Sequence, residues 1–135
     1  MESQVSDKHH LAALQLAIMQ VLWKLEAATV AEVREALETE QDRPLAYTTV
    51  ATMLTKMERN GQVAHRHQGR LLIYRPAIRQ ENVHRSMVSD LAARLFQGDV
   101  TEMVAHLLDG CEVSPPELAR LRTLVRRKEQ EIDRD

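Results

Sequence analysis

Hydroxyl and basic side chains recur at helical spacing in the stretch AYTTVATMLTKMERNG, residues 46–61. The members of this series share one predicted helix face and are, in order, Thr48, Thr52, Thr55 with Lys56, and Arg59. Threonine hydroxyls can bond phosphate oxygens or base edges, and threonine methyls can pack on thymine methyls. Lysine and arginine suit contacts with phosphates. The series therefore predicts a helix that enters the major groove of DNA; for the threonines alone, the alternative is an ordinary solvated helix face.

This stretch lies in a basic segment, although the whole chain has a net charge of −2. Residues 2–42 hold eight acids against three bases, whereas residues 43–79 hold seven bases against one acid, Glu58. The seven bases are Arg43, Lys56, Arg59, Arg66, Arg70, Arg75 and Arg79. Clustered charge of one sign is typical of proteins that bind a polyanion, even when the total charge is near zero. The distribution therefore favours a nucleic acid as partner.

Three predicted helices would position these side chains. Apolar periodicity predicts the first helix over residues 7–26. Thr29 and Glu32 have the spacing of a capping box, which opens the second helix. The third covers about 47–60, and its buried face would consist of Val50, Met53, Leu54 and Met57.

A β-hairpin is predicted directly after the third helix. Two short β-like runs, 63–67 and 71–75, are joined by a turn that contains Gly69. Three helices followed by a hairpin form a winged helix-turn-helix, a known DNA-binding arrangement. We therefore expect Arg66, His67 and Arg70 to reach the DNA backbone or the minor groove from this wing.

The remainder of the chain is predicted to be helical. Helices are expected over residues 79–96, after Asp99, and from a Ser114–Glu117 capping box, with fraying after Lys128. These helices carry few large side chains, so they would close a core by interleaving with a second copy in a two-fold dimer. The alternative is that they fold back on the N-terminal part. The residues expected at the dimer interface are Leu91, Leu95, Met103, Val104, Leu107, Leu108, Leu118, Leu121 and Val125.

The sequence thus predicts a mainly α protein with a winged helix-turn-helix domain over residues 1–78 and a helical dimerisation domain over 79–135. Cys111 is the only cysteine, which excludes an internal disulfide and a cysteine metal cluster and fits a reducing cytoplasm. The N-terminus lacks a signal-peptide pattern, and no run of about 20 apolar residues predicts a membrane span. No nucleophile motif and no phosphate-binding glycine loop is present, so neither an enzyme nor a cofactor is predicted.

Two histidines of the predicted wing have another possible role. His65 and His67 are two residues apart on a strand, so both rings can point the same way. Two imidazoles could bind zinc if a third ligand joined them. The positive surroundings favour a wing contact with DNA instead, and no metal site is predicted.

Four segments together resemble the penicillinase repressor (BlaI/MecI) family. AYTTVATMLTKMERNGQVAHRHQGRLLIYRP is similar to its recognition helix and wing, and IMQVLWKLEAATVAEVREAL to its first two helices. LFQGDVTEMVAHLLDG and SPPELARLRTLV are similar to its dimerisation helices. The similarity runs from about Leu11 to Val125, and the combination of the four segments is more specific than any one of them.

The resemblance implies a homodimeric winged-helix repressor that binds a palindromic operator, often with TACA/TGTA-like half-sites. It places Tyr47, Thr48, Thr49, Thr52 and Lys56 on the recognition helix and Arg66, Gly69 and Arg70 in the wing. Members often control β-lactam resistance genes and are cleaved in the dimerisation region after a membrane sensor-protease signals.

The chain departs from the family pattern in two places. The known cleavage point is Asn-Phe, a pair that this sequence lacks; the corresponding region is His106-Leu107. At the first helix, Ala12 and Gln15 stand where members usually have a threonine cap and a glutamate. Two alternative functions remain: a winged-helix regulator released by a small molecule or metal, and a winged-helix module that binds a protein.

Overall fold

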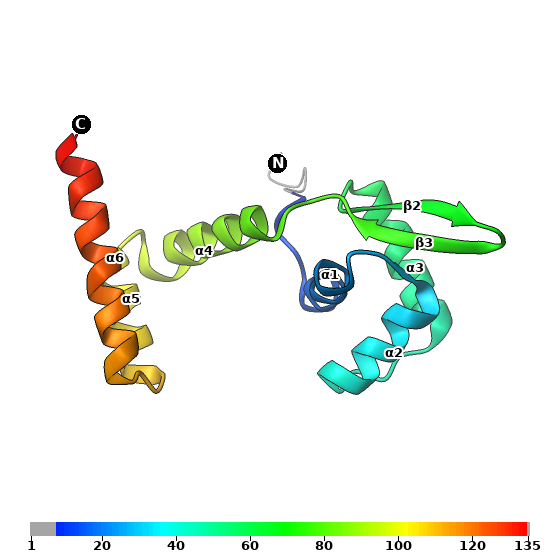
Figure 1. Cartoon of the computed structure of the whole chain (residues 1–135), viewed down its shortest axis with the longest axis horizontal. Helices are drawn as coiled ribbons and strands as arrows, with labels where there is room; N and C mark the ends of the chain where they lie inside the picture. Colours follow the sequence, from blue (N-terminus) through cyan, green and yellow to red (C-terminus); the bar gives the residue numbers. More distant parts are fainter. Residues whose placement is uncertain (1–7, 135) are drawn as a thin grey trace. The chain divides into compact units, whose positions relative to one another are not determined.

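The computed structural model describes residues 8–134 and is mainly helical with one small antiparallel sheet, which confirms the predicted fold class. In chain order the elements are α1 (Ala13–Leu25), β1 (Ala28–Thr29), α2 (Val30–Gln41), α3 (Tyr47–Arg59), β2 (Val63–Gln68), β3 (Leu71–Pro76), α4 (Gln80–Phe96), α5 (Val100–Gly110) and α6 (Pro115–Arg134) (Figure 1). The chain divides between Asp90 and Leu91 into two compact units. The first unit holds the three helices, the sheet and the start of α4.

The core of the first unit lies among α1, α2, α3 and the sheet. Every one of these helices contributes side chains that are completely shielded from solvent: Ile18 and Leu22 from α1, Val33 and Leu37 from α2, and Val50, Leu54 and Met57 from α3. The predicted capping box starts α2: Glu32 N–H donates to Thr29 Oγ1 at 3.1 Å, and Thr29 N–H donates to Glu32 Oε1 at 2.8 Å. The helix predictions rested on this apolar spacing, and the buried faces agree with it.

The sheet has three strands in the order β1-β3-β2, all antiparallel. The hairpin strands were predicted, and Tyr74 of β3 is paired with His65 of β2 on one side and Ala28 of β1 on the other. The sequence did not reveal β1, because its two residues are too few to show a period of two. Gly69 has φ +64° at the first of the two loop positions, as a type II′ hairpin turn requires.

The first helix starts later than predicted, at Ala13 rather than residue 7, which itself lies outside the described residues. Ala12 is the extended residue before the helix, and its N–H donates to Gln15 Oε1 at 3.1 Å. Upstream, the carbonyl oxygen of Lys8 accepts a hydrogen bond from Gln62 Nε2 at 3.2 Å. The carbonyl oxygen of Lys8 is therefore bonded to the side chain of Gln62 and not to a backbone N–H of a helical turn.

The second unit consists of the end of α4 with α5 and α6. Asp99 Oδ1 accepts from Glu102 N–H at 3.0 Å, and Ser114 with Glu117 forms the second predicted capping box. The helix α6 continues to Arg134, so the expected fraying after Lys128 is wrong. An ion pair of Lys128 with Glu131 at 3.8 Å, one turn apart, supports this last part of the helix.

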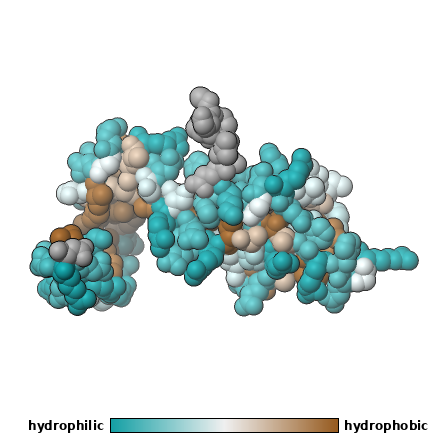
Figure 2. Space-filling model, turned by 90° about the horizontal axis from the view of Figure 1, so that it is seen from above, coloured by the Kyte–Doolittle hydropathy of each residue, from teal (hydrophilic) through white to brown (hydrophobic). Residues whose placement is uncertain are grey.

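The helices α5 and α6 bury none of their residues. Apolar surface is open to solvent on this unit (Figure 2). The large exposed side chains here are Leu91, Leu95, Val100, Val104, Leu107, Leu108, Leu118, Leu121, Leu124, Val125 and Ile132. A unit of this kind lacks a closed core of its own.

Candidate nucleic-acid interface

The exposed face of α3 carries the threonine series predicted from the sequence. Thr48, Thr49, Thr52 and Lys56 line an open hollow of about 420 Å³ together with Met53. Met53 is the one lining residue that the sequence analysis assigned to the core instead. Its thioether accepts a weak hydrogen bond from Gln15 Nε2 of α1 at 3.9 Å. The hollow therefore combines hydroxyl and ammonium groups with one soft apolar side chain, a surface that suits base edges and thymine methyls.

The start of α3 has no side-chain cap. Ala46 occupies the N-cap position and offers no side-chain acceptor; its backbone carbonyl accepts from the N–H groups of Thr49 and Val50, at 3.1 and 3.2 Å. Tyr47, 52% exposed, and Thr48 begin the helix at this end. Unpaired N–H groups and the helix dipole make such an end favourable for a phosphate. The residue types at this end therefore fit a helix that starts against a nucleic-acid backbone.

Thr55 differs from its neighbours in the series, because its hydroxyl is engaged within the protein. Thr55 Oγ1 donates to the carbonyl oxygen of Ala51 at 3.0 Å, and the Thr55 side chain lies near enough to the hydroxyl of Tyr74 on β3 to influence its pKa. Burial raises the pKa of Tyr74 above its ordinary value of 10.0, and the neighbouring Thr55 hydroxyl partly opposes that shift. Thr55 thus links α3 to the hairpin, a role that the helical spacing alone does not reveal.

The hairpin presents its basic side chains at an exposed tip, which projects beyond the helices of its unit (Figure 1). Arg66 Nη1 donates to Gln68 Oε1 at 3.2 Å, so the guanidinium is held along the strand near the turn. Arg70 follows Gly69 in the turn itself and has no ion-pair partner within residues 8–134. Both cations are available to a phosphate.

All of the predicted DNA-binding residues are exposed to solvent: Arg43, Tyr47, Thr48, Thr49, Thr52, Lys56, Arg59, Arg66, His67, Gly69 and Arg70. The hollow on α3 brings Thr48, Thr49, Thr52 and Lys56 together. Arg43 lies apart from them, in the loop between α2 and α3, where its backbone N–H donates to the carbonyl oxygen of Leu37 at 2.9 Å.

His65 and His67 share one face of β2, with their ring centroids 5.5 Å apart and nearly perpendicular. His65 Nδ1 is 2.6 Å from Glu58 Oε1 of α3, so this nitrogen has a carboxylate partner. Within residues 8–134 no histidine, cysteine and acidic side chains gather in a group of three or more that could hold a metal ion. The pairing with Glu58 was not recognised in the sequence, where Glu58 counted only as a charge.

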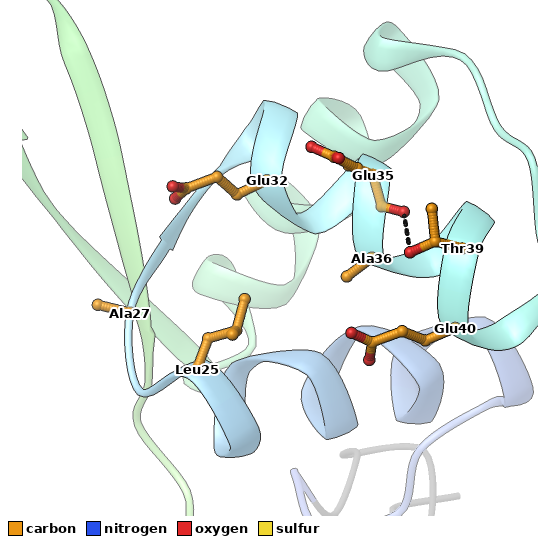
Figure 3. Close-up of a pocket in the computed structure, with 7 residues that line it drawn as sticks. All are labelled: Leu25, Ala27, Glu32, Glu35, Ala36, Thr39 and Glu40. Atoms are coloured by element: carbon orange, nitrogen blue, oxygen red, sulfur yellow. Dashed lines mark hydrogen bonds between the residues drawn. The ribbon is translucent and has the colours of Figure 1, made fainter.

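A second hollow, of about 320 Å³, lies between the end of α1 and α2 (Figure 3). Leu25, Ala27 and Ala36 supply its apolar part. Its polar lining is mainly acidic and consists of Glu32, Glu35, Thr39 and Glu40. Carboxylates repel phosphates, so this hollow does not suit DNA. The first unit therefore has charge of opposite sign on α2 and on the hairpin with α3.

No helix within the described residues is long and apolar enough to cross a membrane. Comparison with known proteins gives a match of residues 11–127 to the family model described as penicillinase repressor. The penicillinase repressor of Bacillus licheniformis is 27% identical over 119 residues, which cover 87% of this chain and 86% of that protein. The transcriptional regulator BlaI of Mycobacterium tuberculosis is 35% identical over 101 residues, covering 73% and 72%.

Among solved structures, the complex structure of hsRosR-S4 has a similar fold, with a TM-score of 0.55 at 16% identity. The match covers 97% of each chain. At this identity the similarity concerns the fold alone.

Proposed function

From the premise that this chain belongs to the penicillinase repressor family of DNA-binding transcriptional repressors, we propose that it binds a palindromic operator as a homodimer. The observation that carries the proposal is the exposed threonine and lysine face of α3, next to a hairpin whose tip is basic. The site also gives no support to an enzyme, and the family is one of repressors.

In this proposal α3 lies in the major groove. Thr48, Thr49 and Thr52 face base edges, and Lys56 lies close enough to the groove wall for a phosphate contact. The uncapped start of α3 points its free N–H groups at a backbone phosphate. Arg66 and Arg70 follow the neighbouring backbone from the wing. The acidic hollow of α2 stays away from the DNA.

The homodimer is proposed from the exposed apolar side chains of α4, α5 and α6. Residues such as Leu107, 52% exposed, and Val125, 60% exposed, would be buried against the same residues of a second copy. Full burial of such a side chain contributes about 1.5–3 kcal/mol, so burying the half that is still exposed contributes roughly 1 kcal/mol each. A two-fold dimer presents two copies of α3 related by symmetry, and a palindromic operator has the matching symmetry.

For the release of the operator we propose cleavage in α5 near His106-Leu107, triggered in the cytoplasm by a membrane sensor-protease. Both residues are exposed, although they lie within the helix, and His106 packs its ring 5.3 Å from that of Phe96. A protease needs an extended substrate, so α5 would have to unwind locally before cleavage. Mass spectrometry of the protein from induced cells would test this; an intact chain in derepressed cells would favour a small-molecule signal instead.

The test of operator binding is fluorescence anisotropy over a series of salt concentrations. The DNA upstream of the protein's own gene is compared with a shuffled duplex of equal length. Tight binding of the upstream DNA at two subunits per site, with an affinity that falls steeply with salt, is expected. Equal and weak binding of both duplexes would contradict the proposal.

A further inference from the structure

The single acid of the basic segment has a specific partner. Glu58 lies in the last turn of α3, and its Oε1 is 2.6 Å from Nδ1 of His65 on β2. The side chains are 34% and 32% exposed, so water screens the contact only partly. The shortness of the contact is typical of a hydrogen bond strengthened by charge. A carboxylate of the proposed recognition helix is thus tied to the first half of the hairpin.

A second link runs beside the first. Tyr74 is opposite His65 in the strand register, and their ring centroids are 5.6 Å apart. The hydroxyl of Tyr74 lies near the side chain of Thr55, which precedes Glu58 by three residues and so lies one turn earlier on the same side of α3. Two neighbouring positions of the helix therefore lie against two facing positions of the hairpin, and the bond between Glu58 and His65 joins one of these pairs.

We propose that Glu58 and His65 are positioning residues, which fix the angle of the hairpin to α3 and make DNA affinity depend on the protonation of His65. This inference rests on the proposed function, because the angle matters only if both elements contact the same duplex. From His65 the strand runs on to Arg66 and the turn with Arg70, so a small rotation at His65 displaces these cations from their phosphates. Neither residue touches DNA in this scheme.

Charge gives the direction of the pH dependence. A neutral His65 leaves the pair with the negative charge of Glu58, close to a polyanion, whereas a protonated His65 cancels it. The other titratable groups that face His65 are His67 of β2 and Tyr74 of β3, and Tyr74 is uncharged below pH 10. Histidine is the side chain that ordinarily changes charge between pH 5 and 8. Affinity for the operator is therefore expected to rise as the pH falls from 8 to 6.

The test measures operator affinity by anisotropy between pH 6 and 8 at constant ionic strength. His65→Gln is expected to abolish most of a pH-dependent gain of roughly fivefold, the size of a partly exposed charge pair. Glu58→Gln keeps an acceptor oxygen and removes the charge, so it should flatten the same profile. His10→Gln is the matched control, because His10 is also paired with a carboxylate, Asp90 at 3.3 Å, outside the proposed interface. Its profile should match that of the unmodified protein.

A second measurement does not depend on DNA. Hydrogen exchange of the β2 and β3 amides in the free protein is expected to be faster in Glu58→Ala, which removes the bond altogether, than in the unmodified protein. Unchanged exchange, or a wild-type pH profile in His65→Gln, would overturn the positioning role. If the unmodified protein fails to prefer the operator while exchange still responds to Glu58→Ala, the proposed function fails and the link itself stands.

Discussion

The indole Nε1 of Trp23 donates a hydrogen bond to the carbonyl oxygen of Ile78, 3.0 Å away, and so ties α1 to the chain just after the hairpin. The indole also meets the ring of His84 edge-on, at a centroid distance of 6.4 Å. One side chain of the first helix thereby fixes both the exit of β3 and the first turns of α4. The base of the hairpin is consequently anchored independently of the links to α3.

Trp23→Phe is expected to lower the free energy of unfolding by about 1 kcal/mol, because the partly buried carbonyl of Ile78 loses its donor. Urea unfolding followed by circular dichroism measures this. His84→Ala removes the ring contact and keeps the hydrogen bond, so it should cost less. An equal loss in the two variants would show that packing, and not the hydrogen bond, is what Trp23 contributes.

Stability should fall at alkaline pH through Tyr74. Because burial raises its pKa in the folded protein above 10.0, the unfolded chain releases this proton first as the pH rises. The contribution is complete below pH 10 and is lost as the pH rises through the folded-state pKa, at a slope of up to about 1.4 kcal/mol per pH unit. Urea unfolding from pH 9 to 11 should show a shallower decline in Tyr74→Phe. The exposed Tyr47→Phe is the control and should decline like the unmodified protein.

Arg70→Ala should weaken binding to operator and shuffled DNA by the same factor and reduce the slope of log affinity against log salt by about 0.9. The reason is the loss of one phosphate contact from the tip of the wing. Arg85→Ala, which breaks an ion pair with Glu81 on α4, serves as the control and should leave the slope unchanged. A full slope in Arg70→Ala would remove this residue from the phosphate contacts.

Thr52→Ala should reduce the preference for the operator by about 1 kcal/mol, with a smaller effect on binding to shuffled DNA. Its hydroxyl and methyl groups lie in the hollow on α3, where a base edge would be read. Thr39→Ala is a matched control, because Thr39 is also an exposed helical threonine but lines the acidic hollow of α2. Competition anisotropy with both duplexes measures the two affinities. An equal loss of affinity for the operator and for the shuffled duplex would argue against base reading by Thr52.

Leu121→Asp should convert the protein to a monomer. Leu121 is 38% exposed, and a two-fold interface would contain the residue twice, so the dimer would lose the burial of two leucines and would have to bury two unpaired carboxylates, at a cost of several kcal/mol. Sedimentation velocity measures the oligomeric state, and circular dichroism checks that the helices remain. Thr123→Asp, also exposed on α6 but on the opposite face of the helix, should remain dimeric. If Leu121→Asp also remained dimeric, the dimer interface would not include this face of α6.

Elements with strong local signals were predictable from the sequence. The capping boxes at Thr29 and Ser114 fixed the starts of α2 and α6, and Gly69 marked the hairpin turn. The exposed face of α3 was predictable from helical spacing, because it lies opposite the apolar, buried face. Such features depend on residues within one or two turns of each other, which a single sequence displays directly.

Features that depend on distant partners were missed. Glu58 and His65 are seven residues apart, and only the packing of α3 on the hairpin brings them into contact. The strand β1 exists because Ala28 and Thr29 pair with β3, more than forty residues later, and not through any pattern of their own. The burial of Gln62, which is 2% exposed, also depends on distant segments: its Nε2 donates to Lys8, its N–H donates to Met57, and its carbonyl oxygen accepts from Ala77.

The absence of any buried residue on α5 and α6 also has a consequence for repressor dosage. In the proposed dimer these helices complete their core only with a partner, so folding of this unit is a bimolecular reaction and its melting temperature must rise with protein concentration. Scarce subunits would spend more time open to proteolysis than abundant ones. The level of active repressor would then fall more steeply than in proportion to its synthesis, which sharpens the switch between a silent and an expressed promoter.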